Sequence, residues 1–198
     1  AGATIVRVSV PRVALAVATY YVLATAEASS NLSRYDGVRY GARREGEGLA
    51  ALYRATRSGG FGPEVRRRIL LGTFALSSGY REAWYGRAQR VRALLALDFA
   101  EAFRACDAIL CPTAPGPAFP IGEKGADPLA MYLADVFTVP ASLAGLPALS
   151  VPGGFTGEGL PVGMQLAGPA GSEPLLLALA RVVERGTGPG GRPPGAIR

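Results

Sequence analysis

The chain has 198 residues, no histidine, two cysteines and a formal net charge of +6. Because imidazole is missing, the chain by itself cannot build a Ser-His-Asp or Cys-His catalytic set, or a metal site that uses histidine. Its basic residues are 20 arginines and one lysine, Lys124, which lies in a stretch that we predict to be an exposed turn.

The first predicted element is a β-strand, because polar and apolar residues alternate over Ala3–Val10. A strand directly at the start, with no initiator methionine, suggests either that the chain is a fragment of a larger sheet or that its sheet partners come from another chain. After Pro11, an alanine-rich stretch predicts a helix to about Asn31. Its apolar run, Val13–Ala26, is shorter than the roughly 18–20 residues that a membrane span needs, so we predict no contact with a membrane.

The middle of the chain predicts a helical region. A loop over Arg34–Gly41 carries an Asp-Gly turn signal and is followed by a short helix at about Leu49–Arg57. A second helix is predicted over Glu64–Ser78 and a third, the longest, over about Arg81–Ala105.

The last third alternates short apolar strands with helices. Strands are predicted at 107–112, 148–152 and 161–167, and helices at about 128–132, in part of 135–145 and at 173–185. The Gly/Pro/Arg-rich residues 186–198 predict a disordered tail. This order favours an α/β fold, with one domain over residues 1–185.

Two cysteines in a domain of this size indicate a reducing compartment. Cys106 and Cys111 are five residues apart in a predicted strand, so they face opposite sides and are poorly placed to pair. We therefore expect two buried structural thiols. No secretory leader is visible, and the predicted location is the cytoplasm.

Three places in the chain hold candidate binding residues. Arg66, Arg67 and Arg68 point in different directions on one helix, so at least one faces inward or along an edge, and spacing alone does not say which. The inward arginine either forms a structural ion pair within the protein or binds a carboxylate or phosphate of a ligand. Asp135 interrupts an apolar run and is either a helix N-cap or a buried partner of a ligand. Tyr20 and Tyr21 are adjacent on a helix, so one is expected to face the core and the other a cleft.

Four blocks of sequence are similar to the amidase-signature family. Two are common to many amidases: Asp107-Ala-Ile-Leu-Cys-Pro-Thr-Ala-Pro115, and Leu143–Pro152 with Gly159–Gln165. Two are more specific, Tyr20–Gly41 and Phe61–Tyr80, and resemble the A subunits of the glutamyl-tRNA(Gln)/aspartyl-tRNA(Asn) amidotransferases. The resemblance implies an α/β/α layered fold with a mixed central sheet.

The resemblance also implies a chemistry and its location. The family hydrolyses an amide with a Lys–Ser–Ser triad, whose residues lie in a Gly/Ser-rich segment of the N-terminal half. That segment does not occur here, so we expect no catalytic residue and no metal ligand in this chain. On its own, the chain is predicted to be inactive.

For the binding site, the resemblance implies that an arginine pairs with the glutamine α-carboxylate, an aspartate pairs with its α-ammonium group, and a tyrosine lines the site. The matching positions are Arg68, Asp135 and Tyr20. This choice among the three arginines comes from the resemblance and not from the spacing.

The implied partners are the B and C subunits of the amidotransferase, glutamine, and aminoacyl-tRNA held by the complex. ATP and Mg²⁺ are expected on the partner subunit, with no cofactor in this chain. Two alternatives remain open at this point: a fragment of a stand-alone amidase that acts on another amide, and a non-enzymatic scaffold domain.

Overall fold

The computed structural model describes residues 2–123 and 131–187. The chain divides into two compact units. Unit 1 comprises Ala1–Val17 and Val91–Arg198, and unit 2 comprises Ala18–Arg90. Each unit is described by itself.

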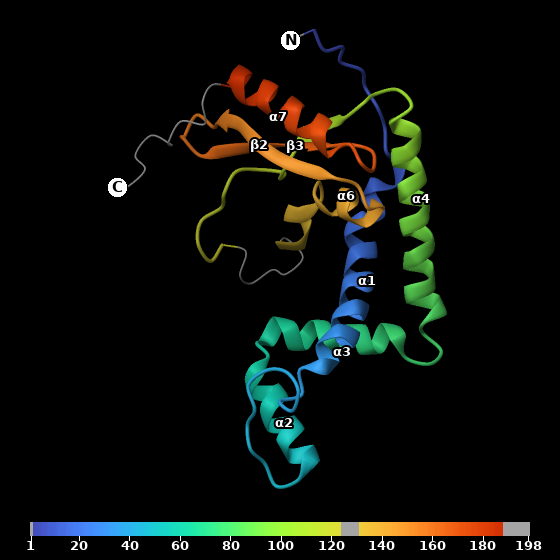
Figure 1. The fold of residues 1–198 in the computed structure, drawn as a ribbon, viewed down its shortest axis with the longest axis vertical. Coiled ribbons are helices and arrows are strands. Elements are labelled where there is room, and N and C mark those ends of the chain that lie inside the picture. The colour runs from blue at the N-terminus through green and yellow to red at the C-terminus, as the bar shows by residue number, and fades with distance from the viewer. Residues whose placement is uncertain (1, 124–130, 188–198) are drawn as a thin grey trace. The chain divides into compact units, whose positions relative to one another are not determined.

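A three-stranded antiparallel sheet lies at the centre of unit 1 (Figure 1). Its strands are β1 (Ile109–Pro112), β2 (Ala148–Phe155) and β3 (Pro161–Ala167), in the order β1-β3-β2. β3 therefore pairs with both neighbours: Leu166, for example, lies opposite both Leu110 and Leu149. The β2–β3 register shifts between Pro152 and Gly154, where β2 has an extra residue.

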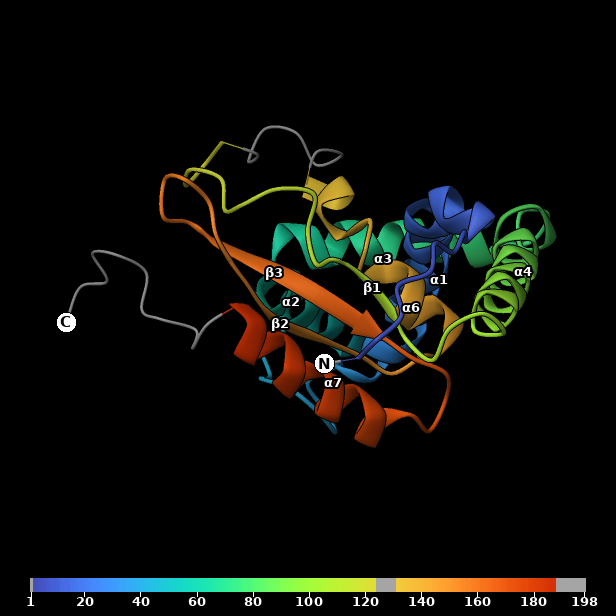
Figure 2. The same ribbon diagram turned by 90° about the horizontal axis from the view of Figure 1, so that it is seen from above.

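Helix α7 (Glu173–Thr187) covers one face of this sheet, as the two views in Figures 1 and 2 show. Its side chains Leu176 and Ala180 form a buried cluster with Val151 of β2 and Leu166 of β3. Strands alternate inward and outward side chains while the helix presents one apolar stripe, so the two patterns match at this face. The predicted α/β class is confirmed.

Helices complete unit 1. These are the 3-10 turn η1 (Pro11–Leu15), α4 (Arg87–Ala102, which begins in unit 2), the 3-10 turn η4 (Leu133–Asp135) and α6 (Val139–Ala144). Asp98 of α4 accepts from both the backbone N–H and the guanidinium of Arg12. Arg92 Nε donates to the Leu143 carbonyl at 2.9 Å, which ties α4 to the end of α6.

Replacing Asp98 by alanine is expected to lower the free energy of unfolding by about 2 kcal/mol. Asp98 is only 10% exposed, so its loss leaves the Arg12 cation and backbone N–H without their buried acceptor. The control is Glu101→Ala on the same helix, whose pair with Arg104 is more than 70% exposed on both sides, with an expected change below about 0.5 kcal/mol. Urea unfolding followed by circular dichroism measures both, and equal losses would contradict the prediction.

Unit 2 is built from helices. It holds most of α1 (Ala16–Asn31), the 3-10 turn η2 (Leu32–Arg34), α2 (Leu49–Gly60), α3 (Pro63–Leu76) and a π-helical turn at Glu82–Gly86. α1 and α3 approach closely at Gly72. A Cβ atom added there would lie 1.9 Å from the Thr25 carbonyl oxygen, so only glycine allows this crossing.

Helix α2 holds the loop that follows η2. The Thr56 hydroxyl accepts from the Arg44 N–H at 3.0 Å, and Arg57 Nη1 donates to the carbonyls of Leu32 and Tyr35. At the predicted Asp-Gly turn, the Asp36 carboxylate accepts from the N–H groups of Val38 and Arg39. These hydrogen bonds lower the pKa of Asp36, so its carboxylate stays ionised to a lower pH than that of an aspartate without such bonds.

The predicted helices and strands are confirmed at most places, with shifts at their ends. α2 continues to Gly60, the third helix begins as a π-helical turn, and α7 continues to Thr187, so two residues of the predicted tail are helical. Residues 188–198 and the predicted helix start at Pro128 lie outside the described residues.

The predicted strand over Ala3–Val10 is wrong. Residues 2–10 are described and contain no strand, and Ile5 is 86% exposed. Alternation of side chains predicts two faces, but a strand also needs a neighbour to complete its hydrogen bonds.

The helical segment Pro11–Arg34 is longer than the apolar run that we considered. With 24 residues and a mean hydropathy of 1.2, it is long and apolar enough to cross a membrane by length and composition alone. The core helix of a globular protein meets the same criterion. In Pro11–Arg34, 33% of the apolar window is buried. The buried residues include Leu23, Thr25 and Ala26, and the Thr25 backbone packs against Gly72 of α3.

Candidate functional site

The three candidate residues fall in the two units. Tyr20 on α1 and Arg68 on α3 both belong to unit 2, and the structure brings them together. Asp135 ends the turn η4 in unit 1 and is described with that unit.

Among the three consecutive arginines Arg66–Arg68, Arg68 has the most buried side chain. Its side chain is 31% exposed, compared with 51% for Arg67, and Arg66 is exposed as well. Its Nε donates to Glu64 Oε1 at 2.9 Å, and its guanidinium carbon lies 5.7 Å from the centre of the Tyr21 ring. One carboxylate and one aromatic face therefore hold the guanidinium in a defined place.

The environment of Arg68 stabilises its charge. The hydrogen bond with Glu64 raises the pKa of Arg68 most, the Tyr20 hydroxyl raises it further, and partial burial acts in the opposite direction. The guanidinium therefore stays cationic over the whole working pH range. Since Nε is engaged by Glu64, an incoming carboxylate would meet the Nη1/Nη2 end of the fork.

Tyr20 and Tyr21 do not divide between core and cleft as we predicted. Both are half-buried, their rings meet edge to face at 5.2 Å, and both reach Arg68, one by its hydroxyl and the other by its ring. Side chains of this length span the angle between adjacent helix positions. The sequence reasoning also missed Glu64, although its i,i+4 spacing to Arg68 was a usable signal.

Asp135 is exposed and does not cap a helix. The N-cap of α6 is Thr138, whose N–H donates to the Asp135 carbonyl at 3.1 Å. This finding removes the N-cap alternative for α6. The expected burial of Asp135 is not found in this chain. Beside it, Leu133 and Ala134 line a cavity of about 440 Å³ together with residues 114–119 and Glu123.

Gln165 of β3 anchors the Asp135 segment and was not singled out from the sequence. It is 6% exposed, and its Nε2 donates to the Phe137 carbonyl at 2.9 Å, two residues after Asp135. A polar residue within the otherwise apolar strand Pro161–Ala167 was the signal, because a buried amide needs partners.

Neither cysteine forms a disulfide, and burial raises the pKa of both thiols, with the Asp107 carboxylate adding to the effect on Cys106. In the part of the chain that the structure describes, no group of three His, Cys, Asp or Glu side chains could hold a metal ion.

The raised thiol pKa values predict slow alkylation. At pH 7.5, both cysteines should react with iodoacetamide more slowly than free glutathione, because less thiolate is present. The rates should rise with pH beyond the point where glutathione has levelled off. Mass spectrometry of the alkylated peptides measures each site, and fast labelling of Cys111 at neutral pH would contradict the prediction.

Comparison with known proteins gives the family. The family model described as Amidase matches residues 1–177. The chain belongs to the amidase family. The A subunit of the glutamyl-tRNA(Gln) amidotransferase from Rhizorhabdus wittichii is 60% identical over 190 residues, which is 95% of this chain and 38% of that protein. The chain thus spans well under half the length of the curated relatives it matches.

Solved structures agree with this assignment. The A subunit of the glutamyl-tRNA(Gln) amidotransferase from Thermotoga maritima is 44% identical with a TM-score of 0.65, covering 91% of this chain and 34% of that one. A peptide amidase in complex with the inhibitor chymostatin is 29% identical with a TM-score of 0.64, covering 94% of this chain and 37% of that one. The amidase-type α/β fold is therefore confirmed.

Proposed function

We propose that this amidase-family chain is part of the glutaminase subunit of a tRNA-dependent amidotransferase and forms a wall of its glutamine site. The observation that carries the proposal is the guanidinium of Arg68, held by Glu64 and by two tyrosines. The similarity to amidotransferase A subunits, at 60% identity to that of Rhizorhabdus wittichii, supports it.

In the proposed site, the Nη1/Nη2 end of Arg68 receives the glutamine α-carboxylate, and Tyr20 flanks it. The family resemblance alone assigns the α-ammonium group to Asp135 of unit 1, and the bond from Gln165 to the Phe137 carbonyl holds the Asp135 segment against the sheet. A zwitterion needs one fixed charge of each sign. An amidase whose substrate carries neither charge would not need an arginine and an aspartate in its binding site. This difference separates the proposal from the alternative of a stand-alone amidase.

In this proposal, the residues that cleave the amide lie outside this chain. They belong to the part of the longer relatives that this chain does not match. There, a lysine and a serine would activate a second serine, which attacks the amide and releases ammonia. The B and C subunits would be the partners, with ATP and Mg²⁺ on the one that activates Glu-tRNA(Gln) or Asp-tRNA(Asn), all in the cytoplasm. The residues of this chain bind and orient the substrate.

A chimera tests this division of labour. The uncovered part of the Rhizorhabdus wittichii protein is joined ahead of Ala1, and glutamate release from glutamine is measured for the chimera and for the 198-residue chain. We expect activity in the chimera and none in the chain alone. Glutamine hydrolysis by the chain alone, or a folded chimera that hydrolyses simple amides but not glutamine, would overturn the proposal.

A further inference from the structure

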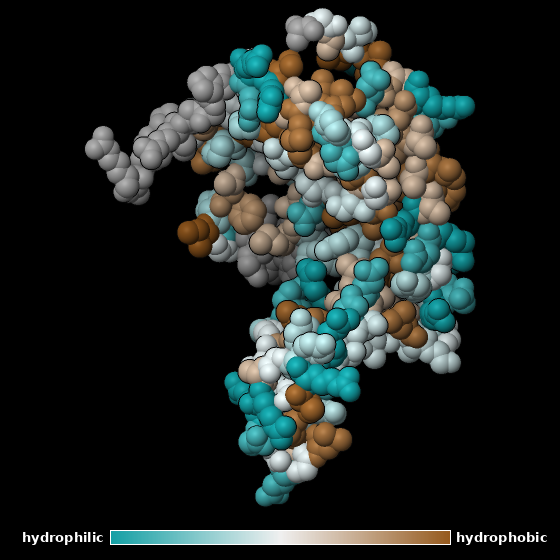
Figure 3. Space-filling view, viewed as in Figure 1, coloured by the Kyte–Doolittle hydropathy of each residue, from teal (hydrophilic) through white to brown (hydrophobic). Residues whose placement is uncertain are grey.

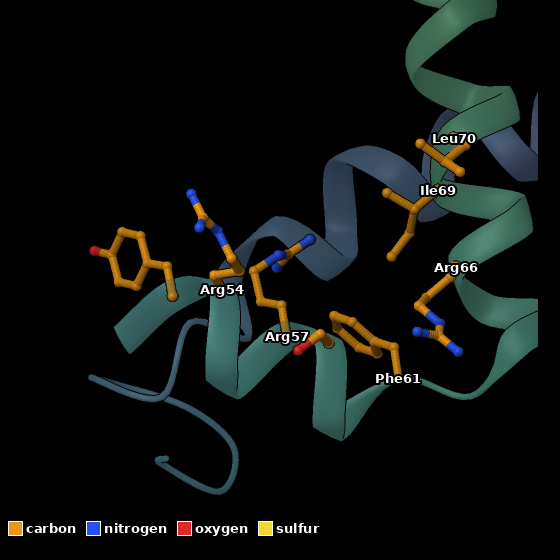
Figure 4. Close-up of a pocket in the computed structure, with 8 residues that line it drawn as sticks. Arg54, Arg57, Phe61, Arg66, Ile69 and Leu70 are labelled. Atoms are coloured by element: carbon orange, nitrogen blue, oxygen red, sulfur yellow. The ribbon is translucent and has the colours of Figure 1, made fainter. Parts of the chain in front are cut away.

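Helices α2 and α3 of unit 2 enclose a second hollow, which is separate from the Arg68 contacts (Figure 4). It has a volume of about 370 Å³, and Arg68 is not among its lining residues. The side chains that the argument uses come from both helices and their junction: Arg54, Arg57, Phe61, Arg66, Ile69 and Leu70. We call this hollow the α2–α3 pocket.

The rim of the α2–α3 pocket is cationic. Its lining includes three arginines and no acidic residue. Arg57 is fixed in place, because its Nη1 donates to the carbonyls of Leu32 and Tyr35 and its guanidinium carbon lies 5.1 Å from the centre of the Phe61 ring. Arg54 and Arg66 are exposed. The pocket therefore attracts an anionic group.

The apolar lining of the pocket combines the aliphatic Ile69 and Leu70 with the aromatic Tyr53 and Phe61. Ile69 points from α3 into the space above Phe61 (Figure 4), and Leu70 beside it is 71% exposed. The apolar surface continues along α3 over Leu71 and Phe74, each 50% exposed. In Figure 3, hydrophobic and strongly hydrophilic residues lie side by side over the α2 end of unit 2. An apolar strip beside a cationic rim is typical of a surface that binds another protein.

The charges and the apolar lining of the pocket select the occupant. A second copy of this chain is disfavoured, because its formal charge is +6. Single-stranded nucleic acid stacks its bases on open aromatic faces. Of the two aromatic lining residues, Phe61 has one face covered by Arg57, which leaves Tyr53, and the apolar lining residues of α3 are the aliphatic Ile69 and Leu70. We propose that the α2–α3 pocket binds an acidic segment of a partner protein, with carboxylates on Arg54 and Arg66 and an apolar side chain on Ile69 and Leu70.

The test selects peptides without assuming their sequence. Random peptides about a dozen residues long are displayed on phage and selected on the full 198-residue chain. We expect the enriched peptides to place Asp or Glu next to an aliphatic or aromatic residue. The most enriched peptide is then synthesised with a fluorescent label, and its binding is measured by anisotropy on the chain and its variants.

Two variants probe the two halves of the pocket. The double variant R54E/R66E should weaken binding of the labelled peptide by at least about 10-fold, and Leu70→Asn should weaken it by about 3-fold. All three positions are exposed, so the fold is retained, which circular dichroism checks. The matched control R81E/R87E changes the net charge of unit 2 by the same amount at two exposed arginines outside the pocket, and it should leave binding within about 2-fold.

Each other result overturns the proposal. These results are selection of no consensus, a consensus without an acidic residue, equal binding by R54E/R66E, or an equal loss in R81E/R87E. The labelled peptide is also challenged with a short single-stranded RNA. If the RNA displaces the peptide and binds more tightly than the peptide does, the occupant is nucleic acid instead.

Discussion

Replacing Arg68 by alanine in the chimeric enzyme is expected to lower kcat/KM for glutamine by about 100-fold, or roughly 3 kcal/mol. The reason is that the α-carboxylate of bound glutamine would lose its only proposed cation while remaining partly desolvated. KM should rise more than kcat falls, because the α-carboxylate is far from the amide that reacts. Steady-state kinetics of glutamate release measure both constants.

Arg67 provides the matched control for this experiment. It precedes Arg68 on α3 and pairs with the same Glu64, at 2.6 Å, but its side chain points to solvent. Arg67→Ala should therefore change kcat/KM by less than about 2-fold. Arg68→Lys should recover only part of the loss, because an ammonium group cannot form the two parallel bonds of a guanidinium fork.

The effect of Arg68→Ala should not depend on pH. Since the pKa of Arg68 is raised above a value that is already high, the wild-type side chain is cationic throughout the accessible range. The ratio of wild-type to variant kcat/KM should be constant between acidic and alkaline buffers. A ratio near one at any pH, or an equal loss in Arg67→Ala, would contradict the assigned role.

Replacing Gly72 by alanine is expected to destabilise unit 2 by about 3 kcal/mol, which lowers Tm by roughly 10 °C. The added Cβ would lie 1.9 Å from the Thr25 carbonyl oxygen and 2.5 Å from its carbon, and backbone atoms cannot move aside as a side-chain end can. The helices α1 and α3 would have to separate. Arg68 lies one turn before Gly72, so the contacts of Arg68 with Tyr20 and Tyr21 should loosen as well.

Gly60 is the control for Gly72→Ala. It also lies in a helix of unit 2, and a Cβ added there would have nothing within 4 Å. Gly60→Ala should be neutral or stabilise slightly, since alanine restricts the unfolded chain. Thermal unfolding by circular dichroism compares the two variants. Equal Tm values for them would show that α1 and α3 do not cross as closely as described.

Local signals account for the elements that the sequence predicted well. Pro63 and Glu64 at the start of α3 and the alternation of helices with apolar strands act over a few residues, so they can be read without knowledge of the fold. The wrong strand at Ala3–Val10 shows the limit, because a strand depends on a partner that is distant in sequence.

The site divides in the same way. The amino-acid sequence alone excludes histidine chemistry and predicts the α/β class. It also shows a family resemblance that points to Tyr20, Arg68 and Asp135. Only the tertiary structure decided that Arg68 is the inward arginine, that both tyrosines contact it, and that Asp135 is no helix cap. The physical reason is that Tyr20 and Tyr21, which orient the guanidinium beside Glu64, lie on a second helix, and the distance between α1 and α3 depends on one glycine contact.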